Sequence, residues 1–458
     1  MQHFDSTPRS VSRSRAALFG LVLAGLVLAG CGGDDDDASP DTNVPSETAE
    51  SAATPTSEAG ASSGSTAAPP SGASTPDRAT QESFVEPTGD PIVTMTIASV
   101  NYNGPTYENG LITAEAYEQY INARGGIKGR PLDVLTCDEQ GVATGSTACA
   151  RQAVEQGAIA VVGAPTFYGG AVEEVLHPAK ISFFGTCCSF TPNEFIDDTA
   201  FVFSSDPITS GAAVLIKAAE DGCTNMVSLG IDIPTMDASA AGAEEILRST
   251  GYEGDLAFVK LPPASQDYSA EIALATRNDP DCLLMVVPEN QVAALLPAFF
   301  ATGSEARLYG SQGNFNAIAV QGFEDRPQVQ EAAIMGLYAD LNSDAYADFR
   351  QALEEYDGDI KDYDYNSLAG LGTWTAYRGF TQVVESIEGE ITAEAFIEAA
   401  GSTVIDNGGQ TGLIDLSEPL SGGIEPYDER IFNRTFLFSR LDGSSAGSLD
   451  MQPIMAAL

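Results

Sequence analysis

The sequence predicts an α/β protein built on two open, doubly wound, mostly parallel sheets. The main observation is a regular alternation of short β-branched runs with longer segments whose apolar residues follow helical spacing. A second observation is that this alternation completes one series and then restarts near residue 211. In addition, about 370 residues follow the N-terminal segments, which is enough chain to cover both faces of two sheets with helices.

The first series opens with the β-branched run from Ile92 to Val100, which is typical of a strand buried on both faces. A helix is expected from about Tyr107 to Arg124. The pair Gly125-Gly126 ends it, because glycine accepts the left-handed conformation of a helix C-cap. Further strands are expected at 131–136, 158–162, 181–184 and 201–204, and further helices at 143–156 and 170–176.

The second series repeats this pattern and then ends in helices followed by strand-like segments. Strands are expected at 226–229, 256–261, 282–287, 307–309, 333–338, 411–416 and 435–440. Helices are expected at 211–220, 238–249, 268–277, 291–301, 343–355, 368–386 and 393–400. Because no short-period repeat is present, the sequence excludes a solenoid.

Residues 1–30 are expected to be a targeting segment rather than a domain. Three arginines precede the apolar run 16–30, which is too short for a comfortable membrane span. The run leads into Leu28-Ala29-Gly30-Cys31, which resembles a bacterial lipobox, in which the peptide is cut before the cysteine and the thiol carries lipid. An ordinary secretory signal with an incidental cysteine is the alternative. Lipidation at Cys31 would anchor the protein to the bacterial cell membrane.

Residues 31–90 are expected to form a disordered acidic tether. The segment consists mainly of Ser, Thr, Ala, Pro, Gly and acids, with almost no large apolar residue before Phe84. Such a composition buries too little surface to offset chain entropy. The run Asp34 to Asp37 keeps the segment extended and solvated. A coil of this length spans roughly 40–45 Å root-mean-square.

The charge balance limits the possible partners. The chain has 65 acidic and 21 basic residues and a formal charge of −44. Residues 91–458 alone carry 52 acids and 17 bases, so the expected folded part is itself acidic. This excess argues against nucleic acid and against electrostatic docking on anionic lipid, because both need a basic surface. It fits either a cationic ligand or a solvation strategy spread over the surface, and the acids are scattered rather than clustered.

The stretch Ile121 to Asp138, INARGGIKGRPLDVLTCD, resembles the helix-GGI-GR-strand signature of type I periplasmic binding proteins of the leucine/isoleucine/valine class. Asn103-Gly104-Pro105 is similar to the SGP-like loop of that family, and VVGAP at 161–165 is similar to its strand-3 turn. The resemblance covers roughly residues 92–440. It implies the substrate-binding lipoprotein of an ABC transporter, with permease subunits and a small solute as partners.

The resemblance also implies hinged lobes built from discontinuous segments. Lobe one is expected at 92–205 plus 334–412, and lobe two at 206–333 plus 413–458. Closure of such lobes buries a ligand between them, and a permease can distinguish the closed state from the open one.

Ligands of open α/β sheets bind outside the carboxyl ends of the strands, where helix N-termini favour anionic groups. The hydroxyls of Thr166 and Ser189 can donate hydrogen bonds there. Glu289 can bind an ammonium group, and the resemblance implies this role because an acid on the second lobe binds the ammonium in the family. As alternatives, Glu289 is a plain acid at a helix N-terminus and Tyr107 simply packs at the start of a helix. The candidate ligand-binding residues are Tyr107, Thr166, Phe167, Tyr168, Cys188, Ser189, Phe190, Asp237, Glu289 and Gln312.

The seven cysteines indicate an oxidising compartment, because six remain once Cys31 is set aside. The expected strand and helix positions allow two pairs, Cys137 with Cys149 and Cys223 with Cys282. The pair Cys187-Cys188 is either a vicinal disulfide or two free thiols. A metal site formed with His177 is disfavoured because no further convergent ligands are indicated, so no metal and no cofactor are expected.

The sequence gives little support for an enzyme. It lacks the HExxH and phosphate-loop motifs. Two GxSxG matches, at 60–64 and 443–447, have no histidine after them and no strand-turn-helix context. We therefore expect an extracytoplasmic, monomeric protein that captures an amino acid, an amide or a related solute by lobe closure and delivers it to an ABC permease. A ligand-sensing receptor of the same fold is the alternative.

Overall fold

The computed structural model describes residues 86–458 except 103–105, 190, 233, 264, 357, 359, 361–362 and 420–429. The targeting segment, Cys31, the tether as far as residue 85, the loop Asn103-Gly104-Pro105 and Phe190 lie outside the described residues. Among the helices described, none has both the length and the apolar character needed to cross a bilayer.

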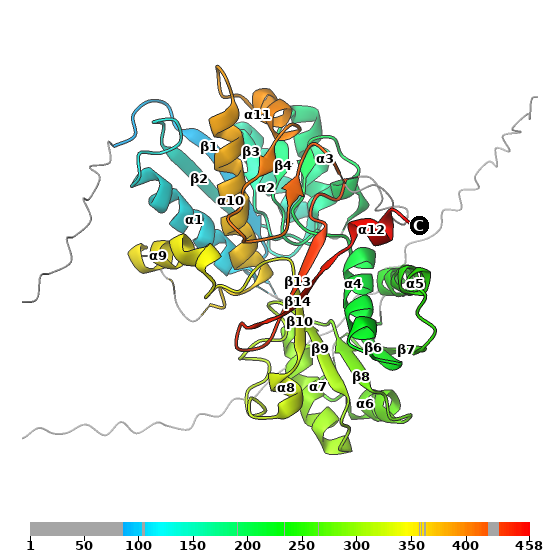
Figure 1. Cartoon of the computed structure of the whole chain (residues 1–458). Coiled ribbons are helices and arrows are strands. Elements are labelled where there is room, and N and C mark those ends of the chain that lie inside the picture. Colours follow the sequence, from blue (N-terminus) through cyan, green and yellow to red (C-terminus); the bar gives the residue numbers. More distant parts are fainter. Residues whose placement is uncertain are drawn as a thin grey trace, which may run out of the picture. The chain divides into compact units, whose positions relative to one another are not determined.

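The first sheet contains five parallel strands in the order β2-β1-β3-β4-β5. Two groups of helices cover its faces, α2 with α3 on one side and α1 with α10 and α11 on the other (Figure 1). The strands are β1 (Ile92–Ala98), β2 (Leu132–Asp138), β3 (Ala160–Val162), β4 (Ser182–Phe184) and β5 (Ala200–Phe201). The helices are α1 (Glu108–Asn122), α2 (Ala143–Glu155), α3 (Gly169–Ala179), α10 (Leu368–Ser386) and α11 (Ala393–Ala400).

The second sheet contains seven strands in the order β14-β13-β10-β9-β8-β6-β7. Strands β6 to β10 are parallel, and β13 and β14 extend one edge as an antiparallel hairpin. The strands are β6 (Asn225–Ile231), β7 (Asp255–Leu261), β8 (Cys282–Met285), β9 (Arg307–Ser311), β10 (Ala333–Gly336), β13 (Thr435–Ser439) and β14 (Ser445–Asp450). Its helices are α4 (Pro207–Glu220), α5 (Pro234–Ser249), α6 (Ser269–Thr276), α7 (Glu289–Thr302), α8 (Pro327–Gln330) and α12 (Gln452–Met455).

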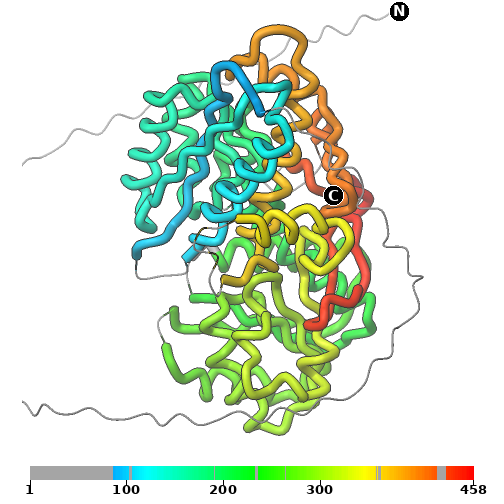
Figure 2. Tube along the Cα trace, turned by 90° about the vertical axis from the view of Figure 1, so that its left-hand side faces the viewer, coloured from blue at the N-terminus to red at the C-terminus, as the bar shows by residue number. Residues whose placement is uncertain are grey.

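The chain passes between the two sheets more than once. It leaves the first sheet after β5, returns after β10 to form α9 (Ala347–Glu355), α10 and α11, and then re-enters the second sheet at β13. Figure 2 shows this mixing, since the orange segment lies with the blue one and the red strands lie with the green elements. The amide of Asn433 donates to the carbonyl of Phe203 at 3.2 Å, which ties two of these passages together.

The expected α/β class and the two mostly parallel sheets are confirmed. Strand β10 belongs to the second sheet. The return to lobe one was expected at residue 334, but the chain leaves the second sheet only after Gly336. Within the expected strand 411–416, only β12 (Ile414–Asp415) is extended, and it pairs with β11 (Val404–Ile405). No strand was expected at β14, because its residues SAGSLD contain no apolar run. The GxSxG match at 443–447 lies at the β13–β14 hairpin rather than at a nucleophile elbow.

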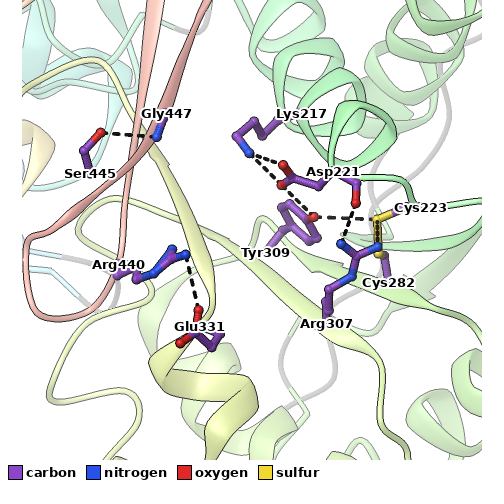
Figure 3. Close-up of polar contacts among 10 residues, drawn as sticks. All are labelled: Lys217, Asp221, Cys223, Cys282, Arg307, Tyr309, Glu331, Arg440, Ser445 and Gly447. Carbon is purple, nitrogen blue, oxygen red and sulfur yellow. Dashed lines mark hydrogen bonds and ion pairs between the residues drawn. A yellow bond between two sulfur atoms is a disulfide. The ribbon is translucent and has the colours of Figure 1, made fainter.

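A polar network fixes the end of α4 to the start of β9 (Figure 3). The carboxylate of Asp221 accepts from the ammonium of Lys217 at 2.6 Å and from the hydroxyl of Tyr309 at 3.0 Å. The guanidinium of Arg307 donates to the carbonyl of Asp221 at 2.7 Å and contacts the sulfur of Cys223 at 3.4 Å. Burial and the Asp221 carboxylate raise the pKa of Tyr309, so this phenol remains a donor at physiological pH.

Both expected disulfides are present. Cys137 on β2 is bonded to Cys149 on α2, and Cys223 is bonded to Cys282 at the start of β8. The first bond closes a separation of 12 residues and the second a separation of 59. Because β6 and β8 are neighbours in the sheet, the longer bond fixes two strands whose connection includes β7 and α6.

Removal of the longer bond should destabilise the protein more than removal of the shorter one. Loop-closure entropy gives about 4 kcal/mol for the Cys223–Cys282 bond and about 3 kcal/mol for the Cys137–Cys149 bond. Two double variants, C223A/C282A and C137A/C149A, should therefore differ in free energy of unfolding, as measured by urea titration. Equal losses, or a larger loss for the 137–149 variant, would contradict the loop-length argument.

Helix α3 carries a buried acid, Glu173. Glu173 is 2 % exposed, and neither of its carboxylate oxygens has a hydrogen-bond partner in the described part of the chain. Burial, followed by the nearby carboxylates of Glu194 and Asp197, raises the pKa of Glu173 to about 9. The side chain is therefore neutral at pH 7.

This raised pKa predicts a pH dependence of stability. The folded state keeps the proton of Glu173 up to about pH 9, whereas the unfolded chain releases it near the ordinary carboxyl pKa. Its contribution is fully present below the unfolded pKa and is lost as the pH rises towards the folded pKa. Glu173→Gln should remove this slope, so its stability relative to wild type should improve between pH 5 and pH 8, by up to roughly 1.4 kcal/mol per pH unit. Denaturant titrations of both proteins at pH 5 and pH 8 measure the difference in free energy of unfolding. A difference that is the same at both pH values would contradict the raised pKa of Glu173.

Candidate functional site

The carboxyl edges of the two sheets meet at the start of α1 and α10. The amide of Asn109 on α1 donates to the carbonyl of Asp364 at 2.8 Å and to the hydroxyl of Ser367 at 2.7 Å. On the loop after β9, a Cβ added at Gly313 would lie 3.3 Å from the Cβ of Ser367. The segments that follow β9 and precede α10 are therefore in contact, and the candidate site is built around them.

A buried carboxylate holds the loops of the first sheet together. Glu139 follows β2, is fully buried, and accepts hydroxyl hydrogen bonds from Ser99 and Ser146 at 2.5 Å and from Thr166 at 2.6 Å. The hydroxyl oxygen of Thr166 also accepts the backbone N–H of Tyr168 at 2.9 Å. The hydroxyl of Thr166 is therefore engaged by the protein and positions the loop after β3. Sequence reasoning missed Glu139, although its position directly after a strand was a usable signal.

Aromatic side chains from two loops gather above this carboxylate. The rings of Tyr107 and Phe167 lie 5.5 Å apart, and the hydroxyl of Tyr168 donates to the carbonyl of Gly141 at 3.0 Å. Burial, followed by the thiols of Cys188 and Cys187, raises the pKa of Tyr107 well above its ordinary value. Three of the candidate ligand-binding residues, Tyr107, Phe167 and Tyr168, thus lie on loops that contact each other, and Tyr107 both starts α1 and contacts Phe167.

Cys187 and Cys188 are buried free thiols in the structure, with their sulfur atoms 2.7 Å apart. Burial and the neighbouring Cys188 raise the pKa of Cys187 well above its ordinary value, so the thiol stays protonated. A Cβ at Gly372 on α10 would lie 2.4 Å from the Cβ of Cys187, so only glycine fits beside the pair. The backbone N–H of Ser189 donates to the hydroxyl of Ser204 at 3.2 Å. The hydroxyl of Ser189 is buried without a hydrogen-bond partner among the described residues.

Two carboxylates share one amide on the side of the second sheet. Asn316 donates to Glu289 Oε2 at 2.6 Å and to Asp364 Oδ2 at 3.2 Å. Burial is the main cause that raises the pKa of Asp364, and Glu289 raises it further against the hydrogen bonds from Asn366 and Asn316. These acceptors outnumber the donors that contact them, so the group suits a cationic partner. Sequence reasoning missed Asn316 and Asp364 because they are 48 positions apart and no local pattern links them.

Gln312 lies beside this acidic group. Its amide nitrogen donates to the carbonyl of Tyr338 at 3.1 Å, while its amide oxygen is buried without a partner among the described residues. A cavity of about 250 Å³ is lined here by Gln312, Asn316, Asp364 and Arg440, among others. The second sheet therefore contributes an acceptor-rich wall at the carboxyl ends of β8 and β9.

Asp237 does not join the group. Its carboxylate is 56 % exposed and pairs with the ammonium of Lys260 on β7 at 2.7 Å, while Asp232 pairs with the same ammonium at 3.2 Å. The hydrogen bonds that Lys260 donates to Asp237 and Asp232 raise its pKa, so this surface group keeps its charges.

The described residues contain two groups with metal-ligand types in proximity. One consists of Cys223, Cys282 and Asp281, but its thiols are joined in a disulfide. In the other, His177 Nδ1 lies 2.9 Å from Asp197 and 3.5 Å from Asp198. His177 on α3 is therefore placed beside the two acids that precede β5.

Several solved structures share the fold of the chain at low sequence identity. An extracellular ligand-binding receptor from Verminephrobacter eiseniae is 18 % identical, with a TM-score of 0.61 over 78 % of this chain and 100 % of that one. The substrate-binding protein LivJ of the branched-chain amino acid transporter from Streptococcus pneumoniae, in complex with isoleucine, is 14 % identical, with a TM-score of 0.60 over 80 % and 100 %.

A fatty acid ABC transporter substrate-binding protein from Thermomonospora curvata is 13 % identical, with a TM-score of 0.61 over 81 % of this chain and 93 % of that one. A comparison with curated proteins gave no match. The family model for periplasmic binding proteins matches residues 97–417, which is well over half of the chain. On this match, and in agreement with the two parallel sheets and their shared carboxyl edge, the chain belongs to the periplasmic binding protein family.

Proposed function

We propose that the protein is the extracytoplasmic solute-binding component of an ABC importer and that its solute is a small molecule with an ammonium group, such as an amino acid or a related amide. The observation that carries this proposal is the pair of carboxylates on the Asn316 amide, Glu289 and Asp364. An ammonium supplies three donors and a positive charge, which these acceptors lack.

The opposite wall of the site suits the rest of such a solute. The partly exposed rings of Tyr107, Phe167 and Tyr168 offer apolar surface and edges. The buried hydroxyl of Ser189 is available to a carboxylate or carbonyl group. A solute that touched both walls would favour the closed arrangement over the open one, and a permease would read that difference.

The N-terminal residues add a location to the proposal. A lipid on Cys31 and a tether of about sixty residues would hold a monomeric binding protein at the outer face of the cell membrane. A receptor that reports the same solute to a signalling partner would use the same site. Stimulation of a reconstituted permease by the loaded protein distinguishes transport from sensing.

A thermal-shift screen with amino acids, amides, urea and polyamines tests the proposal. A solute that binds only the folded state raises the apparent melting temperature by mass action. Ammonium-bearing members of the panel should raise it, whereas uncharged members of similar size should not. If no member shifts the melt and the protein instead turns over an ester or peptide, the proposed function is wrong.

Glu289→Gln should weaken binding of the strongest ammonium solute from that screen by roughly 10- to 100-fold. The change removes a charge-assisted hydrogen bond worth about 1.5–3 kcal/mol but keeps an acceptor for Asn316. The matched control is Asp237→Asn, which removes an exposed acid outside the site. Isothermal titration measures both variants. An unchanged affinity for Glu289→Gln, or an equal loss for Asp237→Asn, would remove Glu289 from the site.

A further inference from the structure

A second pocket lies on the helical face of the first sheet, between α1, α9 and α10. It encloses about 190 Å³, and its lining residues are Tyr117, Tyr120, Asp348, Trp374, Arg378, Thr381 and Gln382. None of these residues belongs to the candidate solute site. Both α1 and α10 begin at that site, and at 1.5 Å per residue the lining residues of the pocket lie roughly 9–21 Å further along them.

Aromatic rings form the wall of this pocket. Trp374 makes edge contacts with Tyr117 and Tyr120, at centroid distances of 4.9 and 5.2 Å, and stacks on Phe349 at 4.8 Å. The hydroxyls of Tyr117 and Thr381 form a hydrogen bond of 2.8 Å with each other. The wall is therefore held in place by packing and by its own hydrogen bond, and it offers apolar surface to a guest.

Two donors at the pocket lack a hydrogen-bond acceptor among the residues that the structure describes. Trp374 is fully buried, and its indole N–H has no hydrogen-bond partner among the described residues. Arg378 is 29 % exposed, and within the described part of the chain its guanidinium makes one ion pair, a contact of 3.8 Å with Asp348 that is too long for a hydrogen bond. The side chain of Gln382 does not satisfy the guanidinium, because it is occupied by the backbone of Asp406.

This arrangement is unusual for a strongly acidic chain. Residues 91–458 contain 52 acids and only 17 bases, yet the guanidinium of Arg378 donates no hydrogen bond to any of the described acids. Asp348 is 51 % exposed at the rim, so water screens its charge. A guanidinium and an indole N–H beside aromatic rings match a planar acceptor that has an apolar body.

We propose that this pocket is a second small-molecule site, separate from the solute site, which binds a small carboxylate with an aromatic or branched apolar body. Arg378 and the indole of Trp374 donate to the carboxylate, and Tyr117 and Tyr120 contact the body.

Intrinsic fluorescence tests this directly, because Trp374 is the only tryptophan in the sequence. The full chain is titrated with 3-phenylpropionate, with excitation at the red edge of the tryptophan band, where this probe does not absorb. A saturable change in Trp374 emission is expected. Phenethylamine and 3-phenylpropanol, which lack the carboxylate, should give no saturable change at the same concentrations.

Arg378→Gln should weaken the binding of 3-phenylpropionate at least tenfold, and Arg378→Lys should weaken it less because it keeps the charge. The matched control is Arg124→Gln. Arg124 lies 3.6 Å over the ring of Tyr120 and pairs with Glu355, but it does not line the pocket. Arg124→Gln and Glu289→Gln should both leave the fluorescence titration unchanged.

The proposal is overturned if 3-phenylpropionate gives no saturable change, or if the Arg378 variants bind it as wild type does. Loss of the signal in Glu289→Gln would also overturn it, because the probe would then occupy the solute site. Failure of the solute screen leaves this test intact, since the two readouts involve different residues.

Discussion

The candidate solute site depends on one amide that two acids share. Asn316 follows β9 of the second sheet, and its amide donates both to Glu289 at the start of α7 and to Asp364 before α10. Because α10 packs on the first sheet, this amide connects the two halves of the folded chain. Burial raises the pKa of Asp364, which indicates that its negative charge is poorly solvated in the absence of a cation. A cationic solute would relieve this cost, and the same contact would then favour one arrangement of the two sheets.

The first sheet contributes a rigid frame to the candidate site, and the Ser189 hydroxyl is an unpaired polar group beside it among the described residues. Three hydroxyls donate to the buried Glu139, so the loops after β1, β2 and β3 are fixed against one another. Thr166 belongs to this frame, and the side chains of Phe167 and Tyr168, which follow it, line the candidate site. A site with preset walls loses less entropy when it binds a solute than a site that must order its loops.

The sequence predicted the fold well because its signals are local. β-Branched runs and glycine stops lie within each element, and the GGI-GR stretch indicated the family that the match at 97–417 bears out. The errors arose where pairing decides the structure. Strand β14 consists mostly of small and polar residues and is extended because it pairs with β13, while β10 joins the second sheet by pairing with β9.

The candidate site was harder to predict for the same reason, since Asn316 and Asp364 are separated by 48 positions and meet only in the folded chain. Glu289 was chosen because it starts a helix after a buried strand, and it lies beside Asn316 in the structure. Asp237, chosen by the same rule, faces a lysine at the surface.

The role of the two carboxylates can be tested with two solutes that differ only in their amino group. Isothermal titration of the protein with an α-amino acid, and with its N-acetyl derivative, isolates the contribution of the ammonium. We expect the amino acid to bind and acetylation, which removes the positive charge, to abolish measurable binding. Equal affinity for the two compounds, or binding of the N-acetyl form alone, would contradict a site built on the carboxylates of Glu289 and Asp364.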